Sequence, residues 1–257
     1  MKYGVVLPGG PVTEQIELGR RAEEAGWDGV FVPELAYGVD AWTLLAALAA
    51  TTHRVALGTN LTPLPWRRPW KVAGQVATLD RISGGRAVLG IGVGAVDPAL
   101  PDAGEQTDLR TRAEMMDEGI DLIRTLWSGG GSYHGRHYRF TATPDDTGRA
   151  TVPIWVVAVW PRPKSMRRVL RCAGIITQFT GPRSPDDIRA IRSWLAANGG
   201  APDLDVVVDG ETPADPATAE ERVAPYAEAG ATWWLETRWT EPAEITDRIA
   251  AGPPVQR

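Results

Sequence analysis

The chain has 257 residues and a formal net charge of -5; 43% of its residues are hydrophobic, 23% are charged and one is a cysteine. This length allows two small domains or one large α/β domain, and the mild acidic excess argues against nucleic-acid and anionic-membrane partners. The lone Cys172 excludes an intrachain disulfide and a cysteine-cluster metal site, and it favours the reducing cytoplasm. No apolar run approaches about 18 residues, so no membrane-spanning helix is predicted.

Eight short apolar runs, rich in β-branched residues, recur along the chain at nearly even spacing. They begin near Tyr3, Gly29, Val55, Ala87, Pro153, Gly174, Leu204 and Thr232. Each has the length of a strand and is apolar at successive positions, a pattern typical of parallel strands that are buried on both faces. The sequence therefore predicts eight buried parallel strands.

Helical patterns of apolar and charged residues lie between these runs. They cover residues 13–25, 42–52, 68–81, 108–127, 164–172, 185–198, 217–229 and 242–250. We expect Thr13 and Asp40 to cap the first two helices, because their side-chain oxygens accept hydrogen bonds from helix N–H groups. Gly26 is expected to end the first helix, since glycine readily adopts the left-handed conformation found there.

Eight strands that alternate with eight helices predict a single (β/α)8 TIM barrel over residues 1–257, a fold that typically has about 250 residues. A doubly wound open sheet is the alternative, but it usually needs only about five or six strands. The interval between the fourth and fifth strands is long. We interpret residues 95–152 as an insertion that contains the fourth helix and a loop or hairpin leaning over one mouth of the barrel.

Few groups at the expected active site can transfer protons. Active sites of such barrels lie at the carboxyl ends of the strands, where we predict Glu34 and Glu236 as acid or base candidates and Gln178 as a hydrogen-bonding group for a ring edge. Carboxylates at these positions can also pair with arginines. No nucleophile elbow, phosphate-binding loop or paired-cysteine motif occurs in the sequence. This composition suggests that a cofactor carries the chemistry.

Two local patterns have simpler interpretations than the sites they resemble. GIGVG at residues 90–94 partly matches a dinucleotide fingerprint, but a loop rather than a helix follows it, which favours close approach of a backbone or a flat ligand. His134 and His137 have an HxxH spacing, and no carboxylate or cysteine is placed in the sequence to complete a metal site. A solvent-exposed pair is favoured, and no metal is predicted.

Four segments together resemble the bacterial-luciferase-like flavin monooxygenases and the deazaflavin-dependent oxidoreductases. The signature RRPWKVAGQVATLDRISGGRAVLGIGVG covers residues 67–94, and matches at 109–130, 153–174 and 226–236 follow in the same order. The resemblance implies a barrel that binds reduced FMN or the deazaflavin coenzyme F-420 over the carboxyl ends of its strands. Members of this family are commonly dimers.

The resemblance also assigns residues to the cofactor. They are, in chain order, Thr59, Asn60, Leu61, Gly92, Gly94, Ala158, Val159, Trp160 and Arg162. The first three are expected to lie against the ring, with a non-prolyl cis peptide or a bulge at Asn60–Leu61. The two glycines are expected to leave room for the other ring edge. Ala158, Val159 and Trp160 are expected to surround the phosphate at the start of the fifth helix, where backbone N–H groups bind anions. Arg162 is expected to suit the charged tail of F-420.

The chain departs from the luciferase branch at positions that are polar in that branch. Leu35 stands where the branch has a histidine, and Gly92 and Val93 stand where it has a cysteine and a phosphate-binding arginine. The phosphate contacts are therefore expected to differ. A non-catalytic barrel that binds flavin or a small aromatic molecule is one alternative that follows from these changes.

The predicted function is a monooxygenase that uses O2 and reduced FMN, supplied by a partner flavin reductase, on a small apolar or aromatic substrate. Trp66, Trp70 and Trp239 are predicted to form the apolar wall of the substrate site. The alternative is F-420-dependent hydride transfer, in which Arg- and Lys-rich mouth loops would bind the negatively charged cofactor tail. We expect a cytoplasmic homodimer without nucleic-acid or membrane partners.

Overall fold

Parallel strands close into a barrel in the computed structural model, which describes residues 1–95, 104–141, 148–238 and 244–255. The barrel strands are β1 (Lys2–Val6), β2 (Gly29–Val32), β3 (Ala56–Thr59), β5 (Ala87–Gly92), β8 (Ile154–Trp160), β9 (Gly174–Phe179), β10 (Asp205–Gly210) and β11 (Trp233–Glu236). β1 pairs with both β2 and β11, and the pairing of β3 with β5 closes the ring. A two-residue strand, β4 (Thr62–Pro63), pairs with β5 near its end. The predicted TIM barrel is confirmed.

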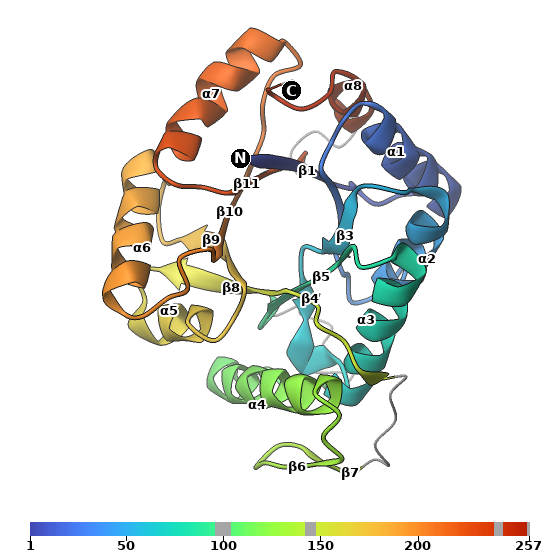
Figure 1. Ribbon diagram of the computed structural model, residues 1–257, viewed down its shortest axis with the longest axis vertical. Helices are drawn as coiled ribbons and strands as arrows, with labels where there is room; N and C mark the ends of the chain where they lie inside the picture. The colour runs from blue at the N-terminus through green and yellow to red at the C-terminus, as the bar shows by residue number, and fades with distance from the viewer. Residues whose placement is uncertain (96–103, 142–147, 239–243, 256–257) are drawn as a thin grey trace.

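Helices form an outer layer around the strands (Figure 1). They are α1 (Val12–Glu24), α2 (Ala41–Thr51), α3 (Pro69–Ser83), α4 (Leu109–Trp127), α5 (Pro163–Val169), α6 (Pro185–Ala197), α7 (Pro216–Glu228) and α8 (Ile245–Ala250). Asp40 caps α2 as predicted, because its carboxylate accepts a hydrogen bond from the Thr43 N–H. The prediction for Thr13 is wrong: α1 begins at Val12, so the N-cap is Pro11, two residues before Thr13, and no side chain caps the helix.

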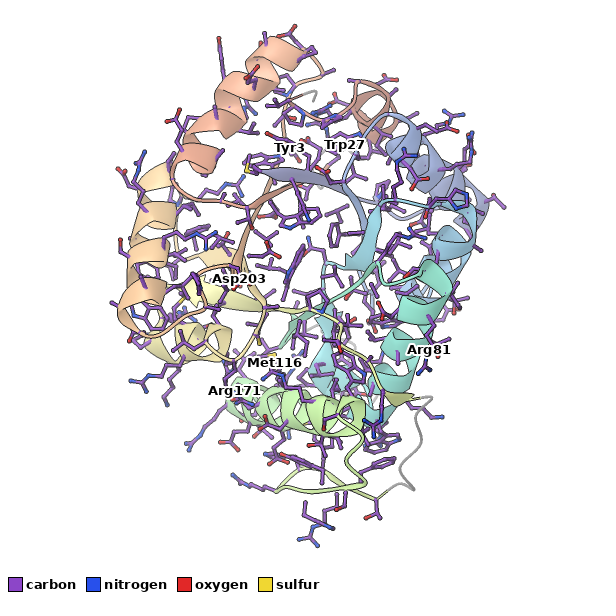
Figure 2. The ribbon with its side chains drawn as sticks, viewed as in Figure 1. Tyr3, Trp27, Arg81, Met116, Arg171 and Asp203 are labelled. Carbon is purple, nitrogen blue, oxygen red and sulfur yellow. The ribbon has the colours of Figure 1, made fainter. Side chains whose placement is uncertain are left out.

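Three aromatic rings fill part of the barrel interior. Phe31 stacks on Trp155 with ring centroids 5.4 Å apart, and Trp233 meets both rings edge-on. Glycines make room for them, since a Cβ atom added to Gly29 would lie 2.8 Å from the Phe31 ring and one added to Gly174 would lie 2.5 Å from Trp155. Figure 2 shows side chains pointing from the strands into the ring as well as outward to the helices. The interior is thus a packed core rather than a channel.

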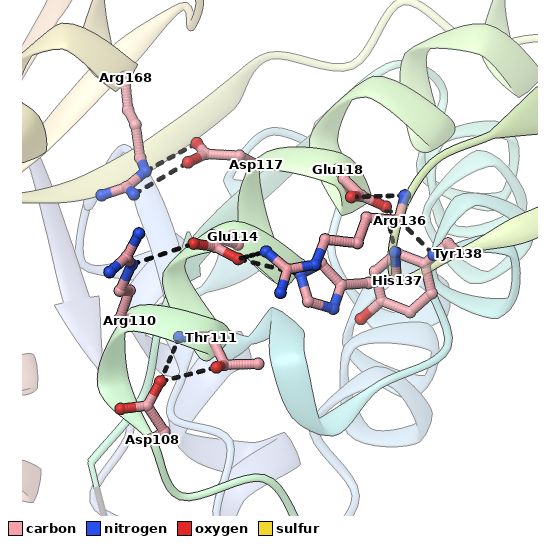
Figure 3. Close-up of polar contacts among 10 residues, drawn as sticks. All are labelled: Asp108, Arg110, Thr111, Glu114, Asp117, Glu118, Arg136, His137, Tyr138 and Arg168. Carbon is pink, nitrogen blue, oxygen red and sulfur yellow. Dashed lines mark hydrogen bonds and ion pairs between the residues drawn. The ribbon is translucent and has the colours of Figure 1, made fainter.

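A hairpin formed by β6 (Ser132–His134) and β7 (Arg139–Thr141) packs against α4. Its turn is held by Glu118, whose carboxylate accepts hydrogen bonds from the backbone N–H groups of Arg136, His137 and Tyr138 at 2.9, 2.9 and 3.1 Å (Figure 3). The hairpin lies on the outer side of α4 in Figure 1, away from the barrel axis. This arrangement differs from the predicted one, in which the hairpin leans over one mouth of the barrel.

Within the described ranges, every helix is too short or too polar to cross a bilayer.

Candidate functional site

Side chains that point into the barrel become accessible toward the carboxyl ends of the strands. On β9, Ile176 belongs to the buried interior cluster, and Gln178, two residues later on the same face, is exposed. On β10, Val207 is fully buried and Asp209 is half-buried. Alternate residues of a strand share one face, so these positions mark the open end of the barrel. We call the accessible residues there the mouth residues: Asn60, Leu61, Val157, Val159, Gln178 and Asp209.

The peptide bond between Asn60 and Leu61 is cis, as the family resemblance implied. Thr59 comes just before it and is fully buried. The Thr59 hydroxyl donates to the carbonyl of Gly90 on β5 at 2.8 Å, and the Thr62 hydroxyl lies 3.1 Å from it. Thr59 therefore positions the end of β3 against β5, with its hydroxyl directed at protein groups.

The two glycines predicted to leave room for the cofactor ring lie close to other protein atoms. A Cβ atom added to Gly92 would lie 3.0 Å from the Leu61 side chain. One added to Gly94 would lie 2.6 Å from Pro63 and 2.9 Å from Arg112, and the φ of Gly94 is +72°. The absence of side chains therefore serves internal packing here, and Leu61, rather than bare backbone, presents the surface at Gly92.

Glu34 is held inside the protein. Its carboxylate is nearly buried, accepts a hydrogen bond from the Thr62 hydroxyl at 2.8 Å and pairs with Arg67, which also contacts Asp40 at 3.0 Å. Burial raises the pKa of Glu34, and the attraction of Arg67 opposes that shift. These contacts fasten the loop after β2 to the segment that precedes α3.

Glu236 is fully buried and lies on the outer face of β11, the face opposite Leu235 in the interior cluster. Its carboxylate accepts hydrogen bonds from the backbone N–H and the hydroxyl of Thr212 at 2.8 and 2.6 Å. Arg238 and Arg248 approach it at 3.6 and 3.7 Å. Burial raises its pKa. This geometry gives Glu34 and Glu236 structural roles, and it offers no support for the catalytic roles predicted for them.

A side cavity of about 520 Å³ lies at the carboxyl ends of the strands, beside the loop after β2. Its lining includes Glu34, Leu35, Tyr37, Trp66 and Arg67. Leu35 and Tyr37 are 61% and 96% exposed, so apolar surface faces solvent here. Trp66 thus lines a cavity, consistent with a substrate wall.

Trp70, also predicted to contact substrate, does not line this cavity. Trp70 stacks on Phe140 of the hairpin with ring centroids 5.1 Å apart, and both rings belong to a groove along α2 and α3. Trp239 lies outside the described residues. Trp70 therefore lies on the outer surface of the barrel, where its ring packs against the hairpin.

The end of β8 carries the residues predicted to bind phosphate. Ala158 is fully buried in the cluster that faces the helices, while Val159 and Trp160 are half-buried and Arg162 is exposed. The Val159 N–H donates to the Ser165 hydroxyl at 3.0 Å. Ser165, in the first turn of α5, is not among the residues predicted from the sequence, although its hydroxyl lies at the turn between β8 and α5. The phosphate assignment stays a prediction.

Sequence reasoning also missed two groups that shape the barrel mouth. Asp209 stands two residues after Val207 on the inner face of β10 and pairs with Arg183 at 3.2 Å; strand alternation was the signal that could have found it. Arg112 of α4 is fully buried and donates to the carbonyls of Val93 and Ala95. It thereby holds the chain that leaves β5.

The two histidines of the HxxH pair lie in different surroundings. In the described part of the chain, no three His, Cys, Asp or Glu side chains are grouped as a metal site requires. His134 is exposed, whereas His137 is largely buried, with its Nε2 3.3 Å from Glu114 on α4. Figure 3 shows His137 beside this helix, within the contacts that hold the hairpin.

Comparison with known proteins places these features in a family. A protein of Mycobacterium tuberculosis with the provisional name of a coenzyme F-420-dependent oxidoreductase is 34% identical over 191 residues, which cover 67% of this chain and 53% of that protein. The oxygenase component of the flavin-dependent trigonelline monooxygenase of Acinetobacter baylyi is 30% identical over 153 residues, 56% of this chain and 47% of that protein. The chain thus spans about half the length of these curated relatives.

Solved structures share the fold. An F-420-dependent secondary alcohol dehydrogenase, solved with an F-420–acetone adduct, superposes with a TM-score of 0.81 at 16% identity and covers 100% of this chain and 99% of its own. The family model described as luciferase-like monooxygenase matches residues 1–252. This match takes in the barrel strands, the mouth residues and the hairpin, and the chain therefore belongs to the luciferase-like monooxygenase family.

Proposed function

We propose that the chain is an oxidoreductase that binds a flavin-type ring, that of coenzyme F-420 or of FMN, at the mouth residues. The observation that carries this proposal is the mixture of side chains there. Leu61, Val157 and Val159 offer apolar contact for a ring face, and Gln178 and Asp209 offer hydrogen bonds for a ring edge. Ligand sites commonly combine an apolar lining with a few placed polar groups.

A bound cofactor of this type would supply hydride transfer or, in the case of reduced FMN, reaction with O2. The chain's own residues bind and orient the ring and shield it from water. They contribute little acid–base chemistry, because the carboxylates of Glu34 and Glu236 are both engaged by protein donors. The side cavity beside Leu35, Tyr37 and Trp66 is apolar enough to take a small apolar or aromatic substrate.

Coenzyme F-420 is the first candidate and FMN the second. Support for F-420 comes from the Mycobacterium tuberculosis relative, whose name refers to that coenzyme. Arg162, Lys164 and Arg167 are all exposed near the end of β8, where they could contact the anionic tail of F-420. Support for FMN and a monooxygenase reaction comes from the flavin-dependent trigonelline monooxygenase.

Anaerobic fluorescence titration of the purified protein with F-420, FMN and reduced FMN tests the proposal. Saturable binding of F-420 more tightly than FMN supports the first candidate, and tighter binding of reduced FMN supports the second. Failure of all three to bind refutes the proposal. Oxidation of the bound, reduced cofactor with and without candidate substrates then separates an enzyme from the non-catalytic binder. The homodimer, the partner reductase and the cytoplasmic location remain predictions.

A further inference from the structure

The side chain of Asp209 faces a different direction from those of Glu34 and Glu236. Glu236 lies on the outer face of its strand, and Glu34 is tied to Thr62 and Arg67. Asp209 follows Val207 on the inner face of β10, opposite Leu235 of β11 in the strand register. Its side chain is 34% exposed, so it reaches the accessible end of the barrel while remaining attached to a rigid strand.

Gln178 is the neighbour of Asp209 on β9. Val207 pairs with Ile176, the last pair of the parallel register. Strand alternation beyond that pair places Asp209 and Gln178 on the same inner face. Adjacent strands are about 4.8 Å apart, which brings the two side chains within reach of one ligand. Gln178 is exposed, and an amide at such a position can donate through its NH2 group.

Arg183, in the loop after β9, holds the Asp209 carboxylate from the helix-facing side of the sheet. Its Nη1 lies 3.2 Å from the Asp209 carboxylate, and its guanidinium lies over the Trp234 ring at 5.5 Å. Gly210 makes this position accessible, since a Cβ atom there would lie 2.3 Å from Arg183 Nη2 and 2.7 Å from Trp234. The guanidinium is thus held in place by stacking and an ion pair, and 29% of the side chain stays exposed.

We propose that Gln178 and Asp209 form a donor–acceptor pair that binds one carbonyl and the N–H of the imide group, –CO–NH–CO–, of the cofactor ring. An imide presents a carbonyl acceptor next to its N–H donor, the complement of an amide N–H beside a carboxylate. FMN and F-420 both carry this group on their pyrimidine ring. The assignment rests on the proposed function, because it requires a flavin-type ring at the mouth residues. Under it, Asp209 is a binding residue that fixes the orientation of the ring.

The charge balance around Asp209 suits this role. Burial raises the pKa of Asp209, and Arg183 opposes that shift as the charged side chain that acts on it within the described residues. Its strand neighbours Gln178 and Leu235 are uncharged. An N–H donor aimed at the carboxylate would add a hydrogen bond to the charged form, and bonds to charged groups are the stronger ones.

The test compares FMN or F-420, whichever binds more tightly, with its derivative methylated at the imide nitrogen. Methylation removes the only imide donor. We expect the unaltered protein to bind the methylated ring about tenfold or more weakly, as is typical for loss of a hydrogen bond to a charged group. In Asp209→Ala the acceptor is absent, and we expect discrimination between the two rings to fall to about threefold or less.

Two further variants keep the result interpretable. Asp205→Ala removes the other acid on the inner face of β10, at the opposite end of the barrel, and should leave the discrimination ratio unchanged. Gln178→Ala alters an exposed side chain, so it should fold even if Asp209→Ala does not. It should weaken binding of the unmethylated ring by about threefold to tenfold, the usual range for one neutral hydrogen bond.

Several outcomes would overturn the assignment. Asp209→Ala that still discriminates as the unaltered protein does would show that another group reads the imide. Equal binding of both rings by the unaltered protein, or full affinity in Gln178→Ala, would also contradict it. If the unaltered protein binds neither FMN nor F-420, the proposed function fails and this assignment fails with it. Binding of either cofactor without the predicted discrimination overturns the assignment alone.

Discussion

Substitution of the buried Glu236 distinguishes a structural role of its carboxylate from a catalytic one. In Glu236→Gln the side chain keeps its size, but Arg238 and Arg248 lose the negative charge that they approach at 3.6 and 3.7 Å. Arg248 is 1% exposed and Glu236 is fully buried, so water cannot reach the Arg248 guanidinium to solvate its charge in place of the carboxylate. Removal of one partner from a buried ion pair typically costs about 3–5 kcal/mol.

The amide can still accept one hydrogen bond from Thr212, which places the expected loss of unfolding free energy near the lower end, about 3 kcal/mol. For a chain of this size, such a loss lowers Tm by roughly 6–12 °C. Urea unfolding followed by tryptophan fluorescence measures the first quantity, and calorimetry the second. Cofactor affinity should stay within about twofold, because Glu236 faces the helices rather than the barrel mouth. An unchanged stability combined with lost turnover would refute this reasoning and restore Glu236 to the catalytic site.

Three other predictions concern the hairpin, the barrel interior and the side cavity. Glu118→Ala leaves three backbone N–H groups without their acceptor, so it should cost about 1–3 kcal/mol and speed hydrogen exchange at residues 136–138; unchanged exchange would contradict the clamp. Gly29→Ala presses a methyl group against a buried ring and should destabilise by about 1–3 kcal/mol in urea unfolding. The matched variant Gly74→Ala, on α3, has no atom near its added Cβ and should stabilise the protein by about 0.5–1 kcal/mol. Equal changes in unfolding free energy in the two variants would show that packing in the barrel interior does not determine the effect of Gly29→Ala. Trp66→Leu should raise the KM for substrate without changing cofactor affinity, while Trp70→Leu, outside the side cavity, should leave KM unchanged; the reverse pattern would move the substrate site.

The barrel could be predicted because its determinants are local. Each strand is a short apolar run and each helix has its own period and end signals, so Asp40 could be assigned as a cap from residues 40–43 alone. Chain order then fixes the topology, since parallel strands joined through helices close in sequence order. The cap expected at Thr13 lies two residues earlier, at Pro11, and α1 has no side-chain cap.

The candidate site was harder to predict because it depends on the direction that side chains face. Position along the chain placed Glu34 and Glu236 at strand ends, yet both carboxylates are bound by residues distant in sequence, Thr62 and Thr212. The contact of Leu61 with Gly92 is likewise invisible from sequence spacing. The place of Trp70 depends on Phe140, the hairpin residue that stacks on it. Phe140 lies 70 positions later in the chain, so sequence spacing near Trp70 does not reveal this contact. The inward direction of Asp209, by contrast, could have been predicted from strand alternation, because it stands two residues after the apolar Val207.

A crystal structure of the protein with bound F-420 or FMN tests the central claim most directly. The account predicts that the ring lies against Leu61 and Val157, with its imide edge within hydrogen-bond distance of Gln178 and Asp209. A ring bound in the side cavity, or at the opposite end of the barrel near Trp155 and Trp233, would contradict it.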